Sequence, residues 1–372
     1  MHSTEAVKRT ALFDRHVALG ARMGNFAGYE MPLWYEGIKA EHLNVRNHVG
    51  IFDLSHMGEF YVKGTQAFDL VQYLTCNDLR RIGDGQCQYT LFPTPDGGVV
   101  DDLIVYQINP EHYLLVVNAN NIAKDFQWVV EHNRFDCDVV NRSDELTLVA
   151  VQGPNTESVL KDFGIKAIAK QRPFTFRRLK IEKRPITIAA TGYTGERGFE
   201  LIIDNEHATW LWDSLMDIGE KYHACPVGLG ARDTLRFEMA YSLYGNELAE
   251  DISVLEANLG WTVRFGPEFL GREFLVKQQQ EGVKRVIAGV VVERNHGAPR
   301  HGASVYSTDG EQIGYITSGS FSPSLNQGIA LVLVDPKYSE PGMNLLVDIR
   351  NKKVQASVIE LPFYRPTKAS SK

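Results

Sequence analysis

The feature that most constrains the fold of this chain is a series of short apolar segments near its C-terminal end. Each segment has the length of a strand and one apolar face, and turn signals such as Asp309-Gly310 and Glu340-Pro341-Gly342 lie between them. Short strands at this spacing are typical of a small β-barrel or sandwich. The segments are residues 285–292, 303–306, 313–317, 329–334, 345–349 and 354–360.

Upstream of these segments the pattern is mixed, and the polar, glycine-containing stretch QQQEGVK at 278–284 is the best boundary. Residues 36–48 and 207–222 have the three-four apolar spacing of helices. The runs 99–108 and 113–118 predict a hairpin, and 146–152 and 186–190 predict further strands. We therefore expect an α+β fold on antiparallel sheets, with a larger region at 1–277 and a C-terminal β-barrel domain at 284–365.

Composition excludes several classes of protein. The 372 residues contain 39 Lys and Arg against 46 Asp and Glu, a formal net charge of −7, without a basic tract, which argues against a nucleic-acid binder. The apolar runs are far shorter than the roughly 20 residues of a membrane span. The first residues interleave charges and lack the apolar core of a signal peptide, so we expect a cytoplasmic protein that does not bind membranes.

Metal binding is not expected either. His42, His48 and His56 are six and eight residues apart, which fits no compact metal motif. The four cysteines are scattered without a CxxC pair and predict reduced thiols. They are Cys76, Cys87, Cys137 and Cys225.

Two adjacent carboxylates, Asp101 and Asp102, interrupt the β-branched run GGVVDDLIVYQ at 97–107. An unpaired charge is costly to bury, so this placement is unusual. Strand alternation puts Asp102 on one face with Val100 and Tyr106, and Asp101 on the other face. One carboxylate should therefore face the interior or a cleft, whereas the other caps the preceding glycine turn or faces solvent. Anchoring of backbone amides remains an alternative for either.

Two further segments could bind a ligand. TGYTGERGFE at 191–200 carries three glycines and Glu200, but it matches neither a Walker A loop nor GxGxxG, so a plain hairpin connection is favoured over a ligand loop. GLGARDTLRFEMAYSLYGNEL at 228–248 predicts a helix starting at Gly230 with Arg232 in its first turn. Such an arginine suits a carboxylate ligand, although pairing with a neighbouring surface Asp or Glu is the simpler alternative.

Taken together, these motifs resemble the glycine-cleavage T-protein family of folate-dependent aminomethyltransferases. The resemblance covers essentially the full length, in the order expected for the family. Its motifs are RTALFDRHVALGARMGNFAGYEMPLWY, VRNHVGIFDLSHMGEF, GGVVDDLIVY, VVNANNIAKDF, LVAVQGP, TGYTGERGFE, GLGARDTLRFEMAYSLYGNEL, GYITSGSFSPSLNQGIALVLV and PFYR. Tyr29, where a Trp is frequent, and the sequence from Met239 to Tyr241 depart from the family pattern and leave the polar positions intact.

The resemblance implies a three-lobed, cloverleaf-like fold, with two lobes from the larger region and tetrahydrofolate as co-substrate in a central channel. The implied reaction takes the aminomethyl group from the lipoyl arm of H-protein, releases ammonia and gives 5,10-methylenetetrahydrofolate. It implies Asp102 as the catalytic acid, Glu200 as the residue that reads the pterin, and Arg232 as the partner of the folate glutamate carboxylate. The remaining implied pocket residues are Met57, Tyr89, Tyr106, Asn118, Tyr193 and Tyr241.

Two alternatives stay open. One is a related folate-dependent demethylase or sarcosine-type methylene transferase, which would differ in the donor. The other is a non-catalytic folate-binding protein of iron–sulfur assembly. Those relatives carry a K-G-C-Y-x-G-Q motif, whereas the corresponding stretch here, FGPEFLGRE at 265–273, contains no cysteine.

Overall fold

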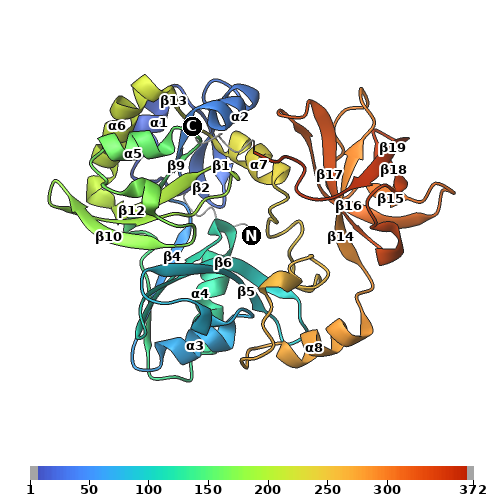
Figure 1. Ribbon diagram of the computed structural model, residues 1–372, viewed down its shortest axis with the longest axis horizontal. Coiled ribbons are helices and arrows are strands. Elements are labelled where there is room, and N and C mark those ends of the chain that lie inside the picture. The colour runs from blue at the N-terminus through green and yellow to red at the C-terminus, as the bar shows by residue number, and fades with distance from the viewer. Residues whose placement is uncertain (1–6, 367–372) are drawn as a thin grey trace.

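The structure is a computed structural model that describes residues 7–366, and it has three lobes (Figure 1). Two lobes are built on antiparallel sheets covered by helices, and the third is a closed barrel. The α+β class and the three-lobed arrangement expected from the sequence are therefore confirmed. The helices are α1 (Phe13–Ala18), α2 (Ile38–Asn47), α3 (Ala67–Leu74), α4 (Ile122–Glu131), α5 (Thr156–Asp162), α6 (Ala208–Gly219), α7 (Leu229–Glu238) and α8 (Arg272–Glu281).

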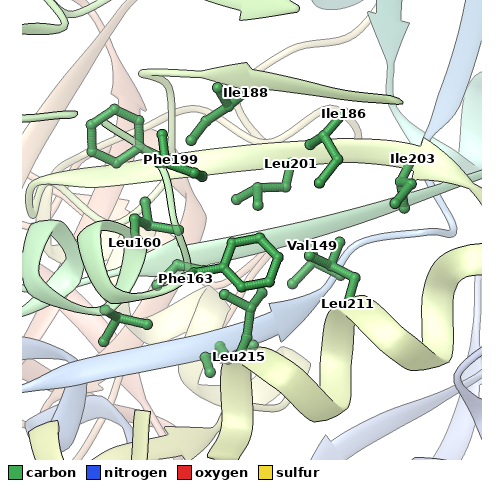
Figure 2. Close-up of a cluster of buried hydrophobic side chains, with 14 of the residues drawn as sticks. Val149, Leu160, Phe163, Ile186, Ile188, Phe199, Leu201, Ile203, Leu211 and Leu215 are labelled. Atoms are coloured by element: carbon green, nitrogen blue, oxygen red, sulfur yellow. The ribbon is translucent and has the colours of Figure 1, made fainter. Parts of the chain in front are cut away.

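The first lobe contains a six-stranded sheet in the order β10-β11-β12-β9-β3-β13, and only the β13–β3 pair is parallel. One face of this sheet packs under α5 and α6, where Leu160, Leu211 and Leu215 meet the strand residues Val149 and Leu201 (Figure 2). The strands are β3 (Val49–Asp53), β9 (Leu146–Gln152), β10 (Phe176–Ile181), β11 (Arg184–Ala189), β12 (Gly198–Asp204) and β13 (Ala224–Pro226), and a separate ribbon pairs β1 (Arg22–Phe26) with β2 (Tyr29–Trp34).

The second lobe is a five-stranded antiparallel sheet in the order β5-β6-β7-β4-β8. Its outer face packs against α3 and α4, where Leu70, Leu74 and Val129 cover Phe60 and Val105. Its other face is turned toward the first lobe. The strands are β4 (Gly58–Lys63), β5 (Gln86–Pro93), β6 (Val99–Asn109), β7 (His112–Val117) and β8 (Asp138–Asn141).

The third lobe is a closed six-stranded barrel in the order β14-β17-β16-β15-β18-β19. Each of the six predicted segments forms one of these strands, and alternate residues such as Val290, Val332 and Val347 fill the interior. Because the sheet closes on itself and has no free edge, the third lobe is the barrel of the two expected forms and not the sandwich. The strands are β14 (Val286–Val292), β15 (Ser304–Tyr306), β16 (Gln312–Ser322), β17 (Gln327–Val334), β18 (Asn344–Ile349) and β19 (Lys352–Ile359).

Two local predictions need correction. The helix expected at 207–222 ends at Gly219, because a 3₁₀ turn continues to Tyr222 and His223 then adopts a left-handed φ of 59°. Val100 does not share the face of Asp102 but packs beneath α3 and α4 with Leu103. The reason is a bulge, since Phe92 pairs with Asp101 while Pro93 pairs with Val99, leaving Val100 as an extra residue that breaks the alternation.

A buried carboxylate at the end of α7 joins the first lobe to the barrel. Glu238 accepts hydrogen bonds from Arg46 on α2 at 3.0 Å, from the backbone N–H of Ser324 at 3.0 Å and from the Ser324 hydroxyl at 2.8 Å. His42 on α2 lies 3.1 Å from the same carboxylate. Although burial alone would raise it, the hydrogen bonds and charges of His42, Ser322 and Arg46 lower the pKa of Glu238 to about 2. The ionised side chain is therefore the form that links the lobes.

We expect Glu238→Gln to lower the free energy of unfolding by about 3 kcal/mol at pH 7, because Arg46 stays buried without its full counter-charge. The native pKa of Glu238 lies below its ordinary value of 4.5, so the stabilisation is present above pH 4.5 and is lost as the pH falls toward 2. Urea unfolding of both proteins at pH 7 and at pH 3 measures this. The matched surface variant Glu145→Gln, whose partner Arg142 is solvent-exposed in part, should change stability by less than about 1 kcal/mol. If the two proteins differed in stability by the same amount at pH 7 and at pH 3, the lowered pKa of Glu238 would be contradicted.

Candidate active site

The candidate site lies where the two sheets face each other. An apolar cluster, here called the interlobe layer, fills this contact with residues from both sheets and from α7. Its members include Phe52, Leu54, Cys87, Tyr106, Leu114, Val116, Leu148, Ala150, Ala189, Ile202, Ala231 and Leu235, with Met57 packed against it. Polar side chains among these residues are largely withdrawn from water, so their charges interact strongly and their proton affinities change.

Asp102 is a partly buried carboxylate on β6 with two side-chain partners. Its Oδ2 accepts a hydrogen bond from the Tyr89 hydroxyl of β5 at 3.0 Å, and its Oδ1 accepts from Asn118 Nδ2 at 2.8 Å. Burial raises the pKa of Asp102 to about 7, the adjacent charge of Asp101 adds to the rise, and the bonds from Tyr89 and Asn118 oppose it. A carboxyl group in this range can both hold and release a proton near neutral pH.

Asp101 neither caps the glycine turn nor faces solvent, in contrast to the first two possibilities considered for it. It is fully buried on the α4 side of the sheet and accepts from the Asn118 N–H at 3.1 Å, from Asn118 Nδ2 at 2.9 Å and from Asn121 Nδ2 at 2.8 Å. The anchoring alternative therefore describes it. Asn118 Nδ2 contacts both Asp101 and Asp102, so the two carboxylates are coupled although they lie on opposite sides of the strand.

The glycine-rich segment forms the connection between β11 and β12, as the hairpin interpretation predicted. Gly195 has a φ of 81°, which strains any other residue, and an added Cβ there would force the Met239 side chain to move. Tyr193 in this loop donates its hydroxyl to the carbonyl of Ser242 and stacks on Tyr241 with ring centroids 5.6 Å apart. The loop is thereby held against the segment that follows α7.

Arg232 lies in the first turn of α7, as predicted, with its guanidinium 4.7 Å from the ring centre of Tyr193. Pairing with a neighbouring acid is not observed: within residues 7–366 the guanidinium makes no ion pair, and Asp233 instead accepts from Arg236 at 2.9 Å. Burial lowers the pKa of Arg232, while Tyr193 and Glu200 oppose the change. A guanidinium with no direct counter-ion among the described residues can bind the carboxylate of a ligand.

Glu200 and Tyr106 face the interlobe layer from opposite sheets. Glu200 on β12 accepts a hydrogen bond from the Thr191 hydroxyl through Oε2. Burial raises the pKa of Glu200, against the lowering effects of Thr191 and Arg232. The Tyr106 hydroxyl on β6 is buried without a hydrogen-bond partner among the described residues. An unpartnered hydroxyl beside a carboxylate provides a donor–acceptor pair for a polar ligand.

The predicted residues thus form three connected groups around one region. Asp102, Tyr89 and Asn118 are joined by hydrogen bonds, and Tyr193 joins Arg232 to Tyr241 through ring contacts. Glu200 pairs on its strand with Ala150 and Ala189, which belong to the interlobe layer together with Tyr106. Besides burial, the charge of Asp102 raises the pKa of Tyr193 and the charge of Arg232 lowers the pKa of Glu200, so the three groups are coupled electrostatically.

Sequence reasoning missed two residues of this region. The His56 side chain is fully buried, its Nδ1 has no partner among the described residues, and burial together with the charge of Arg232 lowers the pKa of His56 to about 4. Trp261 is 59% exposed and stacks on Tyr89 with centroids 5.9 Å apart. The spacing of His56 from His42 and His48 carries no signal for such a position, and no local pattern links Trp261 to Tyr89 across the sequence.

Two observations concern other kinds of site. Within residues 7–366, no three His, Cys, Asp or Glu side chains come together in a way that could hold a metal ion. No helix in the same part of the chain is both long and apolar enough to cross a membrane.

The raised pKa of Asp102 predicts how its replacement changes the stability of the protein at different pH values. The native carboxyl keeps its proton to about pH 7 against an ordinary value of 3.8, so the native state loses stability as the pH rises between these values. Asp102→Asn should therefore stabilise the protein by about 1–3 kcal/mol at pH 8 and by little at pH 4. Thermal unfolding across this pH range measures the difference. Asp101→Asn should destabilise at pH 8, because that carboxylate accepts three hydrogen bonds, and stabilisation by both variants would refute the distinction.

Comparison with known proteins identifies the family of this chain. The family model of the GCVT N-terminal domain matches residues 12–266, and that of the glycine cleavage T-protein C-terminal barrel domain matches residues 285–365. Aminomethyltransferases of Bacteroides thetaiotaomicron and Caldanaerobacter subterraneus are 46% and 43% identical over 363 and 366 residues, which cover 96% and 98% of this chain and 99% and 97% of theirs. The crystal structure of the glycine cleavage system aminomethyltransferase T from Bartonella henselae is 32% identical with a TM-score of 0.90, covering 97% of this chain and 99% of that one. With both domain models matched in order and relatives of this similarity over nearly the full length, the chain belongs to the glycine cleavage T-protein family.

Proposed function

We propose that this protein is a tetrahydrofolate-dependent aminomethyltransferase of the glycine cleavage system. It takes the aminomethyl group from the dihydrolipoyl arm of H-protein, releases ammonia and transfers the carbon to tetrahydrofolate. The observation that carries this proposal is the placement of Asp102, with its pKa near 7, beside a region that also contains Arg232, a cation without an ion pair among the described residues. A proton-handling acid and an anchor for a carboxylate are both required by the two substrates.

The reaction sets clear demands on the site. The carbon of the S-aminomethyl group loses its bonds to sulfur and to the amine nitrogen, and it gains bonds to the two folate nitrogens. The two protons on these nitrogens end on the lipoyl sulfur and on ammonia, so the equation balances without an oxidant. A group that moves protons near neutral pH, and an environment that stabilises a transient iminium-like carbon, would accelerate these steps.

Asp102 is suited to both tasks. Its carboxylate can accept a hydrogen bond from a folate nitrogen, and its negative charge can stabilise positive charge on the transferring carbon. Tyr89 and Asn118 hold the two oxygens at 3.0 Å and 2.8 Å, so the orientation of the carboxylate is set before a substrate binds.

The other side chains match the two ends of folate. Glu200 presents acceptor oxygens to the donor edge of the amino-pyrimidine ring, and Tyr106 adds a hydroxyl donor. Met57 and the rings of Tyr193 and Tyr241 provide apolar walls for a flat ligand. Arg232 provides the planar fork that suits the glutamate carboxylate of the folate tail.

The proposal extends to the partner and the compartment. Lipoylated H-protein is the expected donor, because the aminomethyl group is carried on its arm, and we expect the enzyme to act in the cytoplasm. The demethylase alternative differs only in the donor, and the iron–sulfur assembly alternative lacks turnover. One experiment separates the three: measurement of methylenetetrahydrofolate and ammonia from aminomethylated H-protein, with and without tetrahydrofolate. An N-methyl amine donor in place of H-protein tests the demethylase, and no turnover with either donor would favour the binding protein.

Asp102→Asn should reduce the single-turnover rate of methylenetetrahydrofolate formation by roughly 10²–10⁴-fold, because it removes both the charge and the proton-handling group. Folate binding should persist in part, since Glu200, Arg232 and the tyrosine rings remain. Rapid-quench measurement with aminomethylated H-protein gives the rate, and folate titration of the same variant gives the affinity. Full activity of Asp102→Asn would exclude the proposed role.

Arg232→Ala should raise the KM for tetrahydrofolate with little change in kcat, because the tail carboxylate is bound equally in the ground and transition states. A charge-assisted hydrogen bond of this kind is worth about 1.5–3 kcal/mol, or a 10- to 150-fold increase in KM. Steady-state kinetics with varied folate measures both constants. The matched control Arg294→Ala removes an arginine of the barrel lobe and should leave both unchanged. A collapse of kcat at constant KM would show that Arg232 does something other than hold the tail.

A further inference from the structure

A second buried acid lies behind the two aspartates of β6. Asp125, in the first turn of α4, is fully buried, and neither of its carboxyl oxygens has a hydrogen-bond partner among residues 7–366 if the group is ionised. It faces Asp101, whose oxygens accept from Asn118 and Asn121. No function assigned above uses Asp125.

An ionised Asp125 is physically unfavourable at this position. A buried carboxylate without donors loses its hydration and gains nothing in exchange, and a second carboxylate beside it adds repulsion. Burial, and to a lesser extent the neighbouring Asp101, raise the pKa of Asp125 to about 11, whereas the charge of Lys124 lowers it. A protonated Asp125 resolves the conflict, because its O–H becomes the donor that Asp101 can accept.

On the basis of this juxtaposition, and resting on the function proposed above, we propose that Asp125 is a positioning residue that acts as a protonated acid. It donates a hydrogen bond to Asp101 and, through Asn118, holds Asp102 in its working orientation. The connection runs from Asp125 to Asp101, from Asp101 to the Asn118 amide at 2.9 Å, and from the same amide to Asp102 at 2.8 Å. Asp125 itself does not touch the substrate in this arrangement.

The charged and titratable groups around these acids come from several elements. Asp101 and Asp102 come from β6, Tyr89 from β5, and Asp125 and Lys124 from α4. Tyr193 faces Asp102 from the loop between β11 and β12. The Lys124 ammonium donates to the carbonyl of Val100 and to the Tyr244 hydroxyl at 2.6 Å, and among the described residues it forms no ion pair with these acids.

Two substitutions at Asp125 separate a protonated donor from an ionised acid. Asparagine is neutral and its amide can donate to Asp101, so Asp125→Asn should leave the acidic limb of the kcat–pH profile near its wild-type position. Leucine has a similar size but no donor, so the hydrogen bond to Asp101 would be lost and Asn118 would be held less firmly against Asp102. Because the bond from Asn118 lowers the pKa of Asp102, the limb of Asp125→Leu should move to higher pH by about one unit. A shift of similar size in Asp125→Asn, or no shift in Asp125→Leu, would overturn the proposal.

An infrared measurement tests the protonation state without reference to activity. The difference spectrum of ligand-free wild type minus Asp125→Asn at pH 8 should contain the C=O stretching band of a carboxylic acid. Glu59 on β4 provides the matched control, since it is also a buried acid whose two oxygens have no partner in the described part of the chain, and burial raises the pKa of Glu59 well above its ordinary value. Glu59→Gln should remove a different acid band and leave the pH profile of kcat unchanged.

The two readouts distinguish the possible failures. A carboxylate band in place of the acid band overturns the assignment of Asp125 whatever the enzyme does. If the acid band is present but the profile of Asp125→Leu is unchanged, the positioning role is wrong although the protonation is right. Absence of aminomethyltransferase activity in the wild type would refute the proposed function and would leave the infrared result as the measure of Asp125.

Discussion

The contact between the apolar faces of the first two sheets is the interaction on which the rest of the site depends. It holds two lobes together by burying side chains such as Phe52, Leu148 and Val116, and it also withdraws the neighbouring polar groups from water. The same desolvation raises the pKa of Asp102 and of Glu200, and it lowers the pKa of Arg232 and of His56. Packing and chemistry therefore have one physical origin in this protein.

Acids in this interior are stable only because donors surround them or because they keep their protons. Asp101 has the amides of Asn118 and Asn121, whereas Asp125 has no donor within residues 7–366 and is best accommodated as a neutral acid. Asp102 is intermediate, with two donors and a neighbouring charge. A site of this kind is held in a less stable charge state by the fold around it, which is the usual relation between stability and activity in enzymes.

The barrel is connected to this arrangement through a polar contact, in contrast to the apolar contact between the sheets. Glu238 lies at the end of the helix that carries Arg232. It accepts hydrogen bonds from Arg46 of the first lobe and from Ser322 and Ser324 of the barrel. The position of α7 is therefore set from both sides. Because directional hydrogen bonds fix orientation more narrowly than apolar contact does, this junction aligns Arg232 with the interlobe layer.

The sequence by itself determined the strands of the barrel, the hairpin of β6 and β7, and the placement of Asp102 and Tyr106 on one strand face, because periodicity and turn chemistry are local properties. The ordered motifs in the sequence also identified the resemblance to the family. Tertiary structure alone decided the bulge at Val100, the sharing of Asn118 by two acids and the burial of Asp125. These features depend on contacts between residues distant in the chain and on how far those contacts exclude water. Neither the long-range contacts nor the burial can be read from the residues next to each position.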